Sequence, residues 1–96
     1  MAEETTEEKP QTINPDVLNL IIINPDKIVY EAEITKAMLP TKLGIIAALP
    51  QHTPLYSELV EGTIIITEKA GKTHEEKIDG GVARVKDNRL KILIGF

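Results

Sequence analysis

The sequence predicts a single small all-β domain, and three observations lead to this prediction. The 96 residues suffice for one domain. The aliphatic residues are mostly Ile, Leu and Val, aromatic residues make up only 3%, and β-branched side chains favour strands. No segment keeps a helical periodicity over about ten residues. Short apolar or alternating stretches are instead separated by turn residues. This combination is typical of a β-sandwich or a flattened barrel.

The first strand is expected over residues 17–24, VLNLIIIN, because Leu18, Leu20 and Ile22 share one face of an extended chain. Residues 24–27, NPDK, are expected to form a turn, since proline presets the φ angle that a turn needs.

Residues 31–39 alternate strictly between two faces, which indicates a strand with one solvated face. The alternation places Ile34 and Lys36 on one side and Ala37 on the other. We expect this strand to follow a separate, shorter one over residues 28–30.

Glycine, asparagine and aspartate mark the turns of the second half. Residues 69–71, KAG, form an expected hairpin loop whose glycine supplies a positive φ, and Asp87-Asn88 forms an expected two-residue hairpin turn. Gly80-Gly81 precedes a strand and is interpreted as a bulge or a close approach of two backbones. The nine strands expected in this way span residues 17–24, 28–30, 31–39, 45–49, 55–59, 62–68, 72–78, 82–86 and 89–94.

The stretch over residues 39–55, LPTKLGIIAALPQHTPL, is the centre of the chain. Its prolines exclude a helix, because proline lacks an N–H group and forces the preceding residue to be extended. We expect a loop over Pro40–Ile45, then a short buried strand and a stiff bend. Leu43 and Ile45 are unusual in such a loop, because surface loops are normally polar. This loop is therefore a candidate functional site.

The charge is distributed unevenly along the chain. Residues 1–16 hold five acids and one base, a net charge of −4, whereas residues 17–96 hold ten acids and ten bases. We expect residues 1–16 to be a disordered acidic tail and residues 17–96 to form the domain. A neutral domain offers no nucleic-acid footprint.

The sequence contains no cysteine, no signal-peptide pattern and no apolar run long enough to span a membrane. The chain contains no cysteine, which excludes disulfides and cysteine metal sites and fits a reducing compartment. Its acidic start does not match a signal peptide. The longest apolar runs are far shorter than the ~20 residues that span a bilayer, so we expect a soluble chain without direct membrane insertion.

No arrangement typical of catalysis or of cofactor binding is found. The two histidines, His52 and His74, have no partner at metal-ligand spacing. Ser57, the only serine, is not part of a G-x-S-x-G motif. The glycine pair at 80–81 opens a strand and not a helix, so it is not a phosphate loop. We expect no catalytic residue, no metal and no cofactor.

Lys36-Ala37-Met38 is similar to the modified lysine of biotin- and lipoyl-carrying domains, which are also small and all-β. Those domains present their lysine at a hairpin tip. Lys36 lies inside an alternating strand with no turn residue beside it, so an exposed strand lysine is the preferred interpretation.

The central stretch resembles the epsilon subunit of bacterial F-type ATP synthases, the delta subunit of the mitochondrial enzyme. The similarity comprises Leu39-Pro40, the glycine-bearing loop, the apolar strand over 45–49 and the PQHTPL segment over 50–55. Three further segments extend the resemblance over about residues 18–94: LNLIIINPDKIVYEAEI, EGTIII, and GGVARV with the strand that follows it.

The chain departs from the family pattern in three places. The family often carries an acidic residue in the Gly44–Ile45 region and a second glycine near Ala47, so the loop is more apolar and less flexible here. Asp79 stands where a small residue is common in the family. Many relatives continue into a two-helix C-terminal domain that restrains ATP hydrolysis, whereas this sequence stops at Phe96. Inhibition by helices is therefore not carried over.

The resemblance implies a β-sandwich of about ten strands that acts as a non-catalytic rotor subunit in the central stalk. It implies contact with the c-ring through Thr41, Lys42, Leu43, Gly44 and Ile45, and with the gamma subunit through Gln51, His52 and Thr53. It also implies a peripheral location, on the cytoplasmic face of the plasma membrane, in a proton-driven complex. An unrelated small β-sandwich that binds proteins is the alternative.

Overall fold

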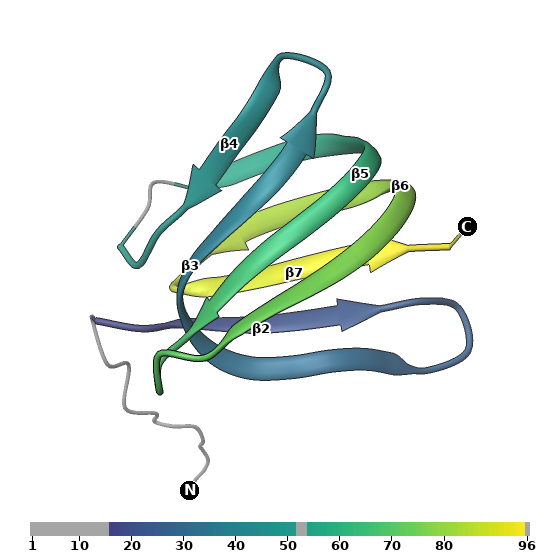
Figure 1. Cartoon of the computed structure of the whole chain (residues 1–96). Helices are drawn as coiled ribbons and strands as arrows, with labels where there is room; N and C mark the ends of the chain where they lie inside the picture. The colour runs from purple at the N-terminus through teal and green to yellow at the C-terminus, as the bar shows by residue number, and fades with distance from the viewer. Residues whose placement is uncertain (1–15, 52–53, 96) are drawn as a thin grey trace, which may run out of the picture.

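A computed structural model of the chain describes residues 16–51 and 54–95. Within these residues every regular element is a strand, which confirms the all-β prediction for the described part (Figure 1). The expected tail over residues 1–16 lies outside the described residues except for Asp16. The strands are β2 (Leu18–Ile23), β3 (Ile28–Thr41), β4 (Gly44–Ala48), β5 (Leu55–Glu68), β6 (Thr73–Lys86) and β7 (Arg89–Ile94).

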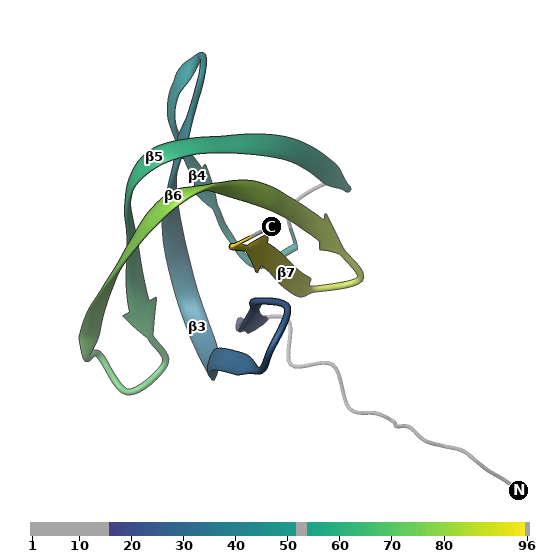
Figure 2. The ribbon, with the colours of Figure 1, turned by 90° about the vertical axis from the view of Figure 1, so that its right-hand side faces the viewer.

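The six strands form one sheet in the order β2-β7-β6-β5-β3-β4, and β2 also pairs with β3. This extra pairing closes β2, β7, β6, β5 and β3 into a barrel, to which β4 is added (Figures 1 and 2). The β2–β7 pair is parallel and the other pairs are antiparallel. Strand β3 pairs with β2 along its first half and with β4 along its last residues.

The described chain has six strands, so the expectation of about ten was wrong. Each of the three long strands, β3, β5 and β6, has 14 residues and combines two of the expected short strands. The glycines at 62, 80 and 81 suggested strand boundaries in the sequence, but they lie inside β5 and β6. A residue without a Cβ lets a strand bend sharply while its ladder continues, so these glycines are bends and not ends.

The bend of β3 changes which side chains face the core. The register of the β3–β5 pairing shifts between Ile34 and Lys36, and both Ile34 and Ala37 are buried whereas Lys36 is exposed. The strict alternation read from the sequence had placed Ala37 opposite Ile34, and this was wrong. A bulge inserts one extra residue and reverses the inward and outward sides beyond it.

Two glycines allow strands to approach closely. A Cβ at Gly81 would clash with the carbonyl oxygen of Leu93 on β7, which confirms the close backbone approach expected at this pair. A Cβ at Gly62 would lie 2.9 Å from the Cβ atom of Pro40, so the ring of Pro40 packs directly on the β5 backbone. Pro40 lies where the β3–β5 register shifts, so its missing N–H group removes no regular ladder bond.

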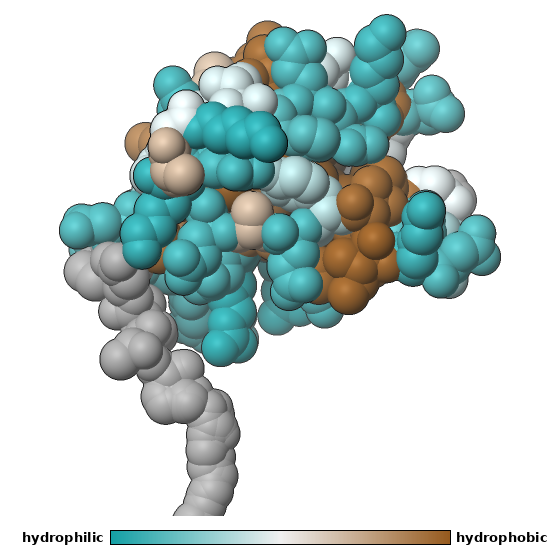
Figure 3. Space-filling view, turned by 60° about the horizontal axis from the view of Figure 1, so that its bottom comes forward, coloured by the Kyte–Doolittle hydropathy of each residue, from teal (hydrophilic) through white to brown (hydrophobic). Residues whose placement is uncertain are grey.

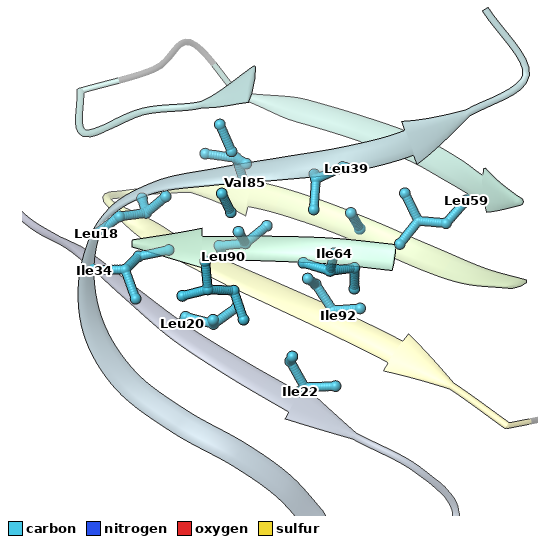
Figure 4. Packing of buried hydrophobic residues seen from close by; sticks show 14 of the residues in the cluster. Leu18, Leu20, Ile22, Ile34, Leu39, Leu59, Ile64, Val85, Leu90 and Ile92 are labelled. Atoms are coloured by element: carbon cyan, nitrogen blue, oxygen red, sulfur yellow. The ribbon is translucent and has the colours of Figure 1, made fainter. Parts of the chain in front are cut away.

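The hydrophobic core fills the inside of the barrel and is built almost entirely from Leu, Ile, Val and Ala (Figure 4). Leu90 and Ile92 of β7 are fully buried, as predicted, and Ile94 packs against the cluster. The core consists of Leu18, Leu20, Ile22, Ile34, Ala37, Leu39, Ala48, Leu59, Ile64, Ile66, Ile78, Ala83, Val85, Leu90 and Ile92.

The predicted turns are confirmed. Asp87 and Asn88 form the two-residue β6–β7 turn with φ angles of 53° and 58°. Gly71 has a φ of 94° in the β5–β6 loop. The Oδ1 atom of Asn24 accepts hydrogen bonds from the backbone N–H groups of Asp26 and Lys27, at 2.8 and 2.9 Å, in the β2–β3 turn.

Candidate functional site

The β3–β4 hairpin presents the residues that the sequence analysis selected. Thr41 pairs with Gly44 across a turn made by Lys42 and Leu43, so the expected loop over residues 40–45 is a tight hairpin tip. The Oγ1 atom of Thr41 donates to the Gly44 carbonyl at 2.6 Å and accepts from the Leu43 N–H group at 3.2 Å. Gly44 has a φ of 116°, which strongly favours glycine. The tip is therefore fixed by local bonds.

The hairpin tip exposes two large aliphatic side chains. Leu43 is 98% exposed and Ile45 is 69% exposed, whereas Leu39 and Ala48 at the base of the same hairpin are fully buried. Burial within the domain therefore does not account for the apolar character of the tip. Exposed aliphatic side chains on a rigid projection fit a contact with another protein.

The second predicted contact lies at the other end of β4, in the turn that contains Pro50 and Gln51. The N–H group of Gln51 donates to the Oδ1 atom of Asn88 at 2.6 Å, which ties this turn to the β6–β7 turn. The other two residues predicted here, His52 and Thr53, lie outside the described residues. The five residues of β4 separate the turn from the hairpin tip by about 17 Å. The described residues of the two predicted contacts therefore lie at opposite ends of β4.

A polar cluster that the sequence analysis did not find lies inside one end of the barrel. The Tyr30 hydroxyl donates to a carboxylate oxygen of Glu68, and the Tyr30 and His74 rings stack with centroids 4.3 Å apart. The Nε2 atom of His74 lies 3.1 Å from Oε1 of Glu76. Burial of the Tyr30 hydroxyl and the Glu68 carboxylate raise the pKa of Tyr30 to about 12. These residues come from three strands, so no local sequence pattern signals the cluster.

The members of the polar cluster hydrogen-bond or stack with one another, so their contacts lie within the cluster. Tyr30 with a raised pKa stays neutral at physiological pH and acts as a hydrogen-bond donor. Within residues 16–51 and 54–95, no three His, Cys, Asp or Glu side chains gather as a metal-binding group. We interpret the cluster as a structural feature that covers one end of the hydrophobic core with hydrogen-bonded polar side chains.

Lys36 is exposed in the middle of β3, close to the bulge, and not at a hairpin tip. Its position therefore does not resemble the tip lysine of a carrier domain. Among the described residues no helix is long and apolar enough to cross a membrane.

Further exposed apolar residues lie away from the hairpin tip. Tyr56 of β5 is 72% exposed and Ile28 at the start of β3 is 53% exposed. Figure 3 shows apolar surface gathered near the β2–β3 hairpin and bordered by hydrophilic residues. Single apolar residues in strands are expected to face the core, so the sequence gives no sign that Tyr56 and Ile28 are exposed.

The comparisons with known proteins agree with this architecture. Residues 17–95 match the family model for the β-sandwich domain of the ATP synthase delta/epsilon chain. An ATP synthase epsilon chain of Leptospira borgpetersenii is 37% identical over 76 residues, 79% of this chain and 59% of the relative. One from Clostridium kluyveri is 36% identical over 78 residues, 81% of this chain and 59% of the relative.

Solved structures show the same fold. A chain in the Euglena gracilis mitochondrial ATP synthase, in a structure of OSCP, F1 and the c-ring, superposes with a TM-score of 0.79 at 19% identity. The superposition covers 97% of this chain and 59% of that one. A chain from the central stalk and c-ring of the Tetrahymena thermophila enzyme gives a TM-score of 0.68 at 17% identity, over 82% and 63% of the two chains.

The sequence thus spans about 59% of the length of these curated relatives. The family match covers nearly all the described residues, from the first strand to the last. This match excludes the alternative hypothesis, an unrelated small β-sandwich that binds proteins. The chain belongs to the family of ATP synthase delta/epsilon chains, of which it contains the β-sandwich domain.

Proposed function

We propose that this domain is a non-catalytic rotor component of an F-type ATP synthase, placed in the central stalk between the c-ring and the gamma subunit. In this role it performs no reaction. It helps to join the ring, which ion flow turns, to gamma, which drives the catalytic head. The family membership and the fold shared with central-stalk structures support this function.

The observation that carries the proposal is the hairpin tip. Its aliphatic pair, Leu43 and Ile45, is exposed on a tight turn whose base is buried in the barrel. We assign Thr41–Ile45 to the c-ring contact. Burial of two aliphatic side chains against the ring loops gives a contact that excludes water, and the short turn holds it in a fixed position.

We assign the gamma contact to the other end of β4, at Gln51 together with residues 52 and 53. The bond from Gln51 to Asn88 holds this turn against the β6–β7 hairpin, so the surface is built from two segments. Two contacts at opposite ends of one short strand suit a domain that lies between two partners. The proposed location is peripheral, on the cytoplasmic face of the plasma membrane, as part of the complex.

Site-directed crosslinking tests the two contacts separately. The chain has no cysteine, so Leu43→Cys and Gln51→Cys each introduce a unique thiol. In the assembled enzyme, Leu43→Cys is expected to crosslink to a c subunit and Gln51→Cys to gamma. Lys72→Cys, exposed in the β5–β6 loop, is the control and is expected to crosslink to neither. The proposed orientation is wrong if the first two variants exchange partners, and the function is wrong if neither crosslinks within the rotor.

A further inference from the structure

Strand β4 forms one border of the sheet. Within residues 16–51 and 54–95 it pairs with β3 and with no other strand, so its second edge is open. Figure 1 shows this strand at the margin of the barrel, in the hairpin that projects from it. An open edge presents backbone N–H and C=O groups that have no partner in the sheet, and such an edge can pair with a strand of another chain.

The pairing with β3 determines which backbone groups of β4 point away from the sheet. Residue pairs in an antiparallel ladder alternate between hydrogen-bonded and non-hydrogen-bonded. Pro40 has no N–H group, so its pair with Ile45 is of the second kind, and so is the pair of Met38 with Ala47 two residues further along. The N–H and C=O groups of Ile45 and Ala47 therefore point outward. No described side chain or turn residue bonds these four groups.

The open edge of β4 lacks the protection that strand edges usually carry. Its five residues, GIIAA, include no charged side chain and no proline. The first half of β6 also has an open side, since among the described strands it pairs only with β5, but it carries Glu75, Lys77 and Asp79 as exposed residues. Charged side chains on an edge oppose pairing with another strand. This contrast makes β4 the edge at which pairing is favoured.

Aliphatic side chains are exposed along the whole length of this edge. Leu43, just before the strand, is 98% exposed, Ile45 within the strand is 69% exposed, and Leu49, just after the strand, is 45% exposed. An occupant of the edge therefore needs an extended backbone and aliphatic side chains at a matching spacing. The β4 strand of a second copy of the chain has both, because an antiparallel pair of identical strands is self-complementary about a two-fold axis.

We propose that the unassembled chain forms a symmetrical dimer in which β4 pairs antiparallel with β4 of a second copy. With Ile46 on the two-fold axis, Ile45 of each copy lies opposite Ala47 of the other, and all the outward backbone groups of the strand are bonded. The same register brings Leu43 of each copy beside Leu49 of the other. Any other two-fold register places an outward residue of β4 opposite a residue beyond the strand.

The dimer uses the hairpin tip that is assigned to the c-ring, so it is a form of the chain outside the complex. It covers the exposed aliphatic side chains until the ring replaces the second copy. Only this competition with the ring rests on the proposed function. The dimer itself follows from the open edge, the register and the exposed aliphatic side chains, and it is tested without any other subunit.

Sedimentation equilibrium of the 96-residue chain tests the dimer. A single short strand pair is at the small end of protein interfaces, so a dissociation constant of about 1 µM to 1 mM is expected. The average mass is expected to rise from 10.6 kDa towards twice that value as the concentration increases through this range. Ile45→Lys is expected to raise the dissociation constant at least about 10-fold, because each copy loses a buried isoleucine. Ile28→Lys, at the exposed β2–β3 hairpin, is the matched control and is expected to leave it unchanged.

Disulfide formation tests the register, and it does not depend on whether Ile45→Lys folds. The chain has no cysteine, so Ile46→Cys places a single thiol on the two-fold axis, where the opposite Cα atoms lie about 4.5 Å apart and can be bridged. In Leu43→Cys the two thiols lie about 20 Å apart in the dimer, although this position is far more exposed.

Under mild oxidation Ile46→Cys is therefore expected to form a disulfide-linked dimer, and Leu43→Cys is not. Random collisions would give the reverse order, because the half-buried position 46 is less accessible. Three results overturn the proposal: a chain that stays monomeric up to about 1 mM, faster crosslinking of Leu43→Cys than of Ile46→Cys, or an equal effect of Ile28→Lys and Ile45→Lys on the dissociation constant.

Discussion

The replacement Leu43→Asp tests the hairpin tip as the ring contact. Leu43 is 98% exposed, so the domain itself gains almost nothing from its side chain. The free energy of unfolding is therefore expected to change by less than ~0.5 kcal/mol, or by about 2–4 °C in melting temperature. By contrast Leu39→Ala, at the fully buried base of the hairpin, is expected to cost about 2–5 kcal/mol.

The effect on binding follows from the same exposure. Full burial of a leucine against a partner contributes about 1.5–3 kcal/mol, and a buried carboxylate adds a desolvation penalty. Leu43→Asp is therefore expected to weaken binding to the ring by at least about 10- to 100-fold. Ile45 is 69% exposed, so Ile45→Asp removes roughly two thirds of a comparable contribution, about 1–2 kcal/mol.

Binding of the 96-residue chain to detergent-purified c-ring, with and without gamma, measures this effect. Thermal unfolding of each variant alone shows whether it is folded. Ile28→Asp is the matched control, since Ile28 is 53% exposed but lies at the β2–β3 hairpin. The reasoning is refuted if Leu43→Asp binds the ring as tightly as the unchanged chain, or if Ile28→Asp weakens ring binding more than Leu43→Asp does.

Three further predictions concern the fold and are checked by chemical denaturation. Gly81→Ala is expected to destabilise the domain by about 2–4 kcal/mol because its Cβ would clash with the Leu93 carbonyl oxygen on β7. Gly80→Ala is expected to cost only about 1 kcal/mol, because its Cβ would lie 3.5 Å from the Leu59 carbonyl oxygen, an ordinary contact; equal effects would contradict the clash. The pKa of Tyr30 is raised from 10.0 to about 12, so the folded domain favours the neutral hydroxyl more than the unfolded chain does. The resulting stabilisation of the folded domain is complete below pH 10 and is lost as the pH rises through 12. Tyr30→Phe, but not exposed Tyr56→Phe, is therefore expected to reduce this loss. Asn88→Ala removes the acceptor of the 51 N–H group and a residue suited to positive φ, and is expected to cost about 1–3 kcal/mol; an unchanged midpoint would argue against that tie.

Much of the fold could be predicted because local rules decide it. The alternation in β2 and β7 places the same leucines and isoleucines inward in sequence and structure. The Asp87-Asn88 and Gly71 turns follow from the few residue types that adopt positive φ. The apolar pair at the β3–β4 tip could be selected from the sequence because loop residues beside a turn glycine are normally polar.

The remaining features depend on distant partners. Gly62 suggested a strand end in the sequence, but a Cβ there would clash with the ring of Pro40 on β3. A close approach of two backbones was expected at Gly80-Gly81, but its partner, the Leu93 carbonyl of β7, could not be named from local residues. The bulge after Ile34 depends on the register with β5, about 30 residues further on, so an alternation rule cannot place it. The stacking of Tyr30 on His74 likewise joins residues that only the closed barrel brings together.

The pairing of β3 bears on the mechanical role proposed for the hairpin tip. A force on Leu43 acts on the C-terminal end of β3. This end is paired with β4 and β5, and the N-terminal half of β3 is paired with β2. The two register shifts in β3 are the positions where it is least supported by the ladder. At the second shift, between Met38 and Thr41, the ring of Pro40 packs on the backbone of Gly62. Side-chain packing therefore supports β3 where its ladder of hydrogen bonds is interrupted. We therefore expect motion of the tip to be transmitted to the barrel and not absorbed by a hinge, which is the property that the proposed coupling role requires.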